Sequence, residues 1–162
     1  MSATVNRSLA LIAGATAGLF LAAAGHAAEL KSPEMVKTGL RILASVYADM
    51  DRKLAADQFD RLPHENQEFQ EGSGALRDAI ANEPAGFKAQ VQSSLASTLT
   101  AANQVAEVSK SHDKAKVQSA LSALAVSMRS LNALFPESVR VEPGSVEAPH
   151  HPPGAGGPPK TS

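Results

Sequence analysis

Two segments of this chain carry the same run of apolar residues at alternating spacings of four and three. A 4-3 alternation places every member on one side of an α-helix, and chance seldom sustains it over nearly three heptads. Both segments are therefore predicted to be amphipathic helices that pack against other helices. The first run is Val36, Leu40, Leu43, Tyr47, Met50 and Leu54, and the second is Val117, Leu121, Leu124, Met128, Leu131 and Phe135.

Local signals mark the ends of these two helices. Ser32 is the expected N-cap of the first, with Pro33 at the first helical position and Glu34 near the positive end of the helix dipole. Asp113 is expected to cap the last helix. Pro136 is expected to end it, because proline disfavours the helical conformation of the residue before it.

The signal between these helices is weaker. Residues 58–82 contain apolar positions, but Gly72 and Gly74 interrupt them, which predicts one interrupted helix or two short ones. After a turn at 82–86, a third stripe extends from Phe87 to Val105, and residues 109–112 form the next turn. No segment alternates as a strand does, so an all-α fold is predicted: an antiparallel up-down-up-down four-helix bundle over residues 32–140.

Both ends of the chain differ from this helical part. Residues 1–28 have the features of a secretory signal peptide, with basic Arg7, an apolar run at 9–24 and small residues around position 27. The run of about sixteen residues is shorter than the roughly 20 needed to span a bilayer. We therefore expect an exported, periplasmic protein with no membrane span after cleavage. Residues 141–162, ten of which are Pro or Gly, are expected to form a disordered tail.

Composition excludes several kinds of function. The chain has no cysteine, which rules out disulfides, thiolate metal sites and thioether-linked cofactors built from its own residues. Its formal net charge of −1 argues against a nucleic-acid-binding protein. The nucleophile-elbow, phosphate-loop and zinc-protease motifs do not occur, so we do not expect an enzyme.

Three stretches of the chain resemble the class II cytochromes c, the cytochrome c-prime type, and their haem-free relatives. They are residues 40–50, the segment from Leu62 to Lys88, and residues 121–135, where the family places a Cys-x-x-Cys-His motif. The resemblance covers most of the foldable chain. It implies a four-helix bundle and, in members that carry haem, electron transfer.

The haem-attachment positions of that family are substituted in this chain. Its two cysteines fall on Met128 and Leu131, its iron-binding histidine falls on Asn132, and its distal position falls near Leu40. Thioether bonds need thiols, and an amide is a poor iron ligand compared with imidazole. The resemblance therefore implies a haem-less relative, in which Met128 and Leu131 fill space on the apolar stripe. It also implies a possible homodimer through the first helices.

Two other functions remain open. Non-covalent haem would use Met35 with a histidine on the last helix, but His112 precedes that helix. Met35, Met50 and Met128 are instead predicted to fill gaps in the core.

Copper or nickel could be held by His64 with Glu68, four residues apart, or by His150 and His151. We expect no cofactor, with haem or copper as the alternatives. The favoured hypothesis is an exported binding or accessory protein with a periplasmic partner that the sequence does not identify.

Overall fold

The computed structural model describes residues 29–145, and this part of the chain contains four α-helices and no strand. The all-α prediction is confirmed for these residues. The signal segment and the tail beyond residue 145 lie outside them. The elements are α1 (Pro33–Ala55), the 3₁₀ turn η1 (Phe59–Arg61), α2 (Leu62–Ala79), α3 (Ala85–Ser109), α4 (Lys114–Asn132) and the 3₁₀ turn η2 (Glu137–Val139).

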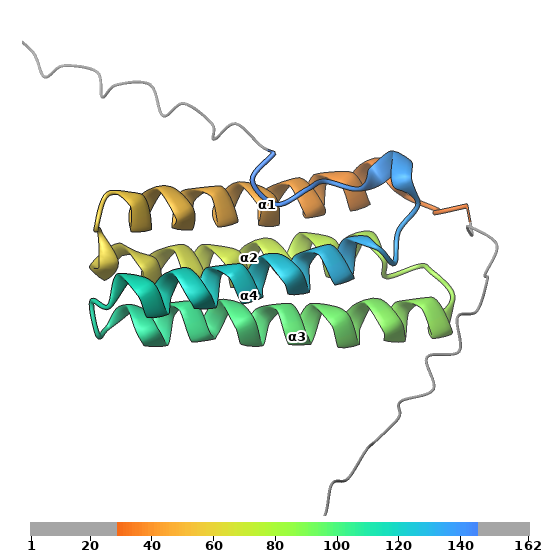
Figure 1. The fold of residues 1–162 in the computed structure, drawn as a ribbon. Coiled ribbons are helices and arrows are strands. Elements are labelled where there is room, and N and C mark those ends of the chain that lie inside the picture. The colour runs from red at the N-terminus through yellow and green to blue at the C-terminus, as the bar shows by residue number, and fades with distance from the viewer. Residues whose placement is uncertain (1–28, 146–162) are drawn as a thin grey trace, which may run out of the picture.

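The four helices lie side by side, and short connections join them at alternating ends, so that consecutive helices are antiparallel (Figure 1). Helix α1 packs mainly against α2, and α3 packs mainly against α4. After α4 the chain turns back over α1. We call residues 133–145 the C-terminal segment. None of the helices within 29–145 is both long and apolar enough to cross a membrane.

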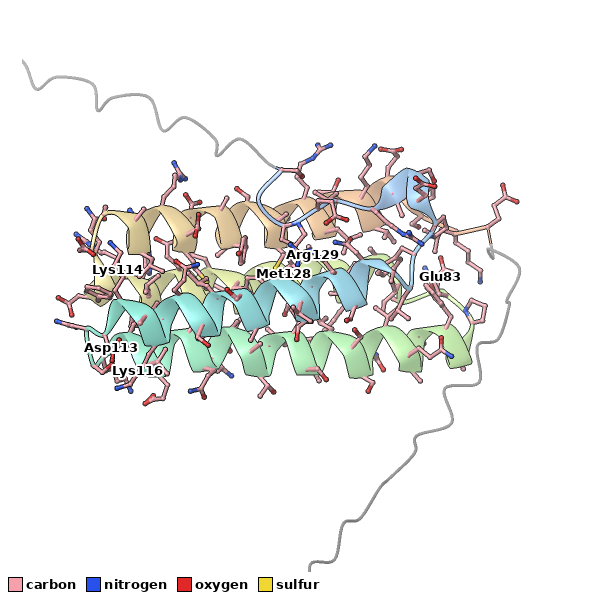
Figure 2. All side chains as sticks on the ribbon, in the orientation of Figure 1. Glu83, Asp113, Lys114, Lys116, Met128 and Arg129 are labelled. Carbon is pink, nitrogen blue, oxygen red and sulfur yellow. The ribbon has the colours of Figure 1, made fainter. Side chains whose placement is uncertain are left out.

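The two apolar stripes form the core, as the spacing predicts. Their members are buried, except that Tyr47 is only partly so. At the start of α4, the Asp113 carboxylate accepts hydrogen bonds from the backbone N–H groups of Ala115 and Lys116, at 3.1 and 3.2 Å. The Lys116 ammonium lies at the same carboxylate (Figure 2), and these contacts hold the pKa of Asp113 below its usual value. Ser32 occupies the N-cap of α1 but makes no side-chain capping bond.

The expected interruption of the second helical segment is wrong: α2 is one continuous helix from Leu62 to Ala79. Gly72 of α2 packs closely against α1. A Cβ atom placed on Gly72 would lie 2.6 Å from the Cγ2 atom of Ile42. The opposite contact is equally tight, because a Cβ on Gly39 would lie 2.9 Å from the Cα atom of Leu76. Glycine here permits two helices to approach closely.

Helix α4 ends at Asn132, three residues before the predicted end at Phe135. The next residues form tighter turns, in which the N–H of Phe135 bonds to the carbonyl of Asn132 at 3.0 Å. Phe135 precedes Pro136, and a following proline disfavours the helical conformation of a residue. Its ring is nevertheless buried and meets the ring of Phe87 edge-on, with centroids 5.7 Å apart. Phe135 therefore belongs to the buried core as the last member of the apolar stripe, although α4 itself ends at Asn132.

The folded unit also continues past Arg140, where the tail was expected to begin. Val141 packs against the core, and the side chain of Asn132 bonds to its backbone. Beside it, the Arg140 Nε donates to the carbonyl of Phe135 at 2.8 Å. These bonds satisfy both backbone groups of Val141 and the carbonyl of Phe135, which explains why a segment rich in Pro and Gly begins as part of the fold.

Gly39 and Gly74 differ most in the space around them, so they provide a matched pair of substitutions to test the close packing of α1 against α2. Gly39→Ala is expected to destabilise the protein by about 1–3 kcal/mol, since its methyl group would meet the backbone of α2. Gly74→Ala has open space and is expected to stabilise α2 by up to about 1 kcal/mol through helix propensity. Urea unfolding followed by circular dichroism measures both. Equal effects of the two substitutions would contradict the close approach at Gly39.

Candidate functional site

An open groove of about 780 Å³ lies between the C-terminal half of α1 and the N-terminal half of α2. Ile42, Ser45 and Val46 line it from the core side of α1. Charged and polar side chains line the remainder: Asp49, Arg52, Lys53, Gln58, His64, Glu65 and Glu68. A volume of this size is in the range of small-molecule binding sites. The mixture of charges indicates a polar ligand.

Glu65 is the unusual member of this groove. The residue is 7% exposed, and within residues 29–145 its carboxylate makes no hydrogen bond or ion pair. Burial raises the pKa of Glu65 above its ordinary value, and the nearby charge of Glu68 raises it further. The cationic groups of the groove act against this rise. A carboxylate in this position carries a cost for the fold, because it is partly desolvated and has no hydrogen-bond partner among residues 29–145.

The other charged groups of the groove are mostly paired. Asp49 and Arg52, one turn apart on α1, form an ion pair. His64 Nε2 lies 3.3 Å from Glu68 Oε1 on α2. The Lys53 ammonium makes no ion pair or hydrogen bond to another described residue, although it lines the same groove as Glu65. The groove thus holds one acid and one base that lack a partner among residues 29–145.

The structure brings His64 and Glu68 together, as the metal hypothesis requires. Both side chains are largely exposed, however, and they contact each other directly. Across residues 29–145, no group of three or more His, Cys, Asp or Glu side chains is arranged to hold a metal ion. His150 and His151 lie outside the described residues. A pair of ligands gives a weak site at best.

The three residues at which the resemblance places haem attachment, Met128, Leu131 and Asn132, are buried in α4. Met128 and Leu131 are core residues, as is Leu40 at the expected distal position. Asn132 is 3% exposed, and both polar atoms of its amide are hydrogen-bonded: Nδ2 donates to the carbonyl of Val141 at 2.7 Å, and Oδ1 accepts from the N–H of Val141 at 3.3 Å. These positions offer no thiol for a thioether bond, and the Asn132 amide is hydrogen-bonded to Val141, so they do not fit a covalently attached haem.

The C-terminal segment is held on α4 by a second residue next to these positions. Arg129 follows Met128 on α4 (Figure 2). Its Nε lies 3.7 Å from a carboxylate oxygen of Glu142. The bonding of Asn132 to Val141 could not be found from the spacing of apolar residues, because it depends on where the chain returns after α4.

One prediction about methionine is wrong. Met50 and Met128 are buried core residues, but Met35 is 54% exposed. It occupies the position before Val36 on α1 and therefore points away from the stripe. This orientation also removes Met35 as a ligand to a group held inside the bundle. The remaining histidine, His112, lies in the turn before α4, where it stacks on Phe59 and contacts Asp60 at 3.1 Å.

Replacement of Asn132 tests its role as the anchor of the C-terminal segment. Asn132→Ala is expected to destabilise the protein by about 1–3 kcal/mol, since two backbone groups of Val141 lose their partner. Hydrogen exchange of the Val141 amide should also become faster. Ser130→Ala, an exposed position two residues earlier, serves as the control and should change neither quantity. Unchanged exchange at Val141 in the Asn132 variant would contradict this role.

The raised pKa of Glu65 gives a pH-dependent prediction. An acid whose pKa is higher in the folded state contributes stability below its unfolded pKa, and this contribution is lost as pH rises through the folded value. Glu65→Gln should therefore be more stable than the parent protein at pH 7, and the advantage should vanish near pH 4. Urea unfolding at both pH values measures it. Glu71→Gln, on the exposed side of α2, should show no such gain; an equal gain would exclude burial as the cause.

Comparison with known proteins gave no match: no protein family, curated protein or solved structure is significantly similar to this chain.

Proposed function

We propose that this chain is an exported helical-bundle binding protein, related in architecture to the class II cytochromes c, that carries no covalent haem. The chain has no cysteine to form a thioether bond. At the position where the resemblance places the iron ligand, it has an amide. The polar groove between α1 and α2 supplies a binding surface instead.

The observation that carries the proposal is the bonding of Asn132. An amide that merely replaced a lost histidine would be left without partners in the core, at considerable cost. Asn132 instead bonds to both backbone groups of Val141 and fixes the C-terminal segment. This supports a bundle in which the cofactor position has a structural role, and in which function resides elsewhere on the surface.

Export is supported by the sequence of residues 1–28, with a basic start, an apolar run and small residues at 25 and 27. A partner or ligand would then be met in the periplasm or outside the cell. A homodimer through α1 stays a prediction; the C-terminal segment already lies on part of this helix. No catalytic activity is part of the proposal.

The proposal is tested on the full chain expressed with its own N-terminal segment and recovered from the cell envelope. We expect a mass that corresponds to cleavage after Ala27, no haem absorption band, and no stoichiometric metal by elemental analysis. One equivalent of haem, covalent or not, would overturn the proposal. Recovery of the uncleaved chain from the cytoplasm alone would overturn the exported location.

A further inference from the structure

Glu65 differs from every other buried polar residue in the described part of the chain. Six of the seven have a side-chain hydrogen bond, and Glu65 has none. The contrast with Glu83 is the clearest, since that buried carboxylate, at the α2–α3 end of the bundle in Figure 2, accepts the N–H of Lys31 at 2.7 Å. The fold therefore supplies at least one side-chain partner to each of the other six, although Asn66 Oδ1 itself has none. At Glu65 the carboxylate is left open to the groove.

The groove supplies a second unpaired charge of opposite sign. Lys53, on α1, faces the same space as Glu65, on α2, yet the two groups are not within ion-pair distance of each other. The remaining acids, Asp49 and Glu68, already have Arg52 and His64 as neighbours. Once these pairs are set aside, one carboxylate and one ammonium are left on opposite sides of the groove.

We propose that this groove binds a small zwitterion, whose ammonium group pairs with Glu65 and whose carboxylate pairs with Lys53. The chemical class is a free amino acid or a short peptide. The inference rests on the proposed function, because it identifies the ligand of the binding surface described above. Such a ligand satisfies both unpaired groups with charge-assisted hydrogen bonds, and it leaves the Asp49–Arg52 and His64–Glu68 pairs intact.

Other ligand classes fit less well. A metal ion needs several converging ligands, and the described residues offer no group of three. A simple anion would meet the carboxylates of Asp49, Glu65 and Glu68. A polycation would meet Arg52 and Lys53 from α1. Only a ligand with both charges matches both unpaired groups. The volume of about 780 Å³ accommodates an amino acid or a short peptide.

The ligand class is tested by nuclear magnetic resonance titration of the isotope-labelled, haem-free protein. The probes are alanine, dialanine, N-acetyl-dialanine, which lacks the ammonium group, and dialanine amide, which lacks the carboxylate. We expect alanine or dialanine to shift the backbone amides of Lys53 and Glu65 in a saturable manner, and each blocked peptide to bind at least about tenfold more weakly. The stronger of the two unblocked probes distinguishes a free amino acid from a peptide as the source.

Two variants test whether the charges of Glu65 and Lys53 are needed for binding. Glu65→Gln and Lys53→Met should each weaken binding of the better probe by about tenfold or more. Glu71→Gln, which removes a carboxylate from α2 outside the groove, should leave the affinity unchanged. Because Lys53 is only partly buried and its aliphatic stem is kept, the Lys53 variant tests the proposal even if the Glu65 variant fails to fold.

Binding of N-acetyl-dialanine as tight as that of dialanine would overturn the assignment of Glu65. No saturable shift with any probe at millimolar concentration would overturn the zwitterion site as a whole. Neither result would bear on the proposed absence of haem or on export of the chain, which are tested separately on the protein recovered from the cell envelope. Conversely, one equivalent of haem in that preparation would overturn the proposed function whatever the titration gives.

Discussion

The close contact between α1 and α2 determines the shape of this molecule. Gly39 and Gly72 allow the backbone of each helix to approach side chains or backbone of the other. Toward the end of α1 and the start of α2, the same two helices present larger and charged residues, and the groove lies there. Ile42 connects the two regions, because it packs on Gly72 and also lines the groove. A bundle without cysteine has no covalent link to impose such a geometry, and packing alone must do so.

The helices with regular apolar stripes were predictable from the sequence, and α2 was not. Glycine in a helix is unfavourable by itself, so Gly72 looks like a break until its partner Ile42 is known. Another signal was present: Leu62, Phe69 and Leu76 recur at intervals of seven and are fully buried. This interval already predicts a continuous stripe. It also places position 65 between the first two buried residues, where an acidic side chain is unexpected.

Prediction of the candidate sites failed where long-range contacts decide the outcome. The apolar stripe placed Met128 and Leu131 in the core correctly, but the bonding of Asn132 depends on a segment that returns after α4 to bring Val141 beside it. Met35 shows the converse: its hydrophobicity suggests burial, yet it lies one position off the stripe and is exposed. His64 and Glu68 were found from their spacing because an i, i+4 pair is a local relation. Contacts within one helix follow from the spacing of residues in the sequence, whereas contacts between segments depend on how the chain folds back.

The position of Glu65 is more consistent with a binding role than with a role in the fold. A leucine there would extend the stripe of Leu62 and Phe69, remove the desolvation cost of a carboxylate, and close the core side of the groove. The remainder of the bundle can bear this cost, since the stripes of α1 and α4 are almost wholly apolar and buried. Stability that is given up at one site, while the other six buried polar residues each have a side-chain hydrogen bond, is the pattern expected of a functional site in an otherwise optimised core. Asn132 and Glu65 thus illustrate two roles of a buried polar residue beside apolar neighbours: Asn132 anchors the C-terminal segment, and Glu65 keeps its carboxylate available to the groove.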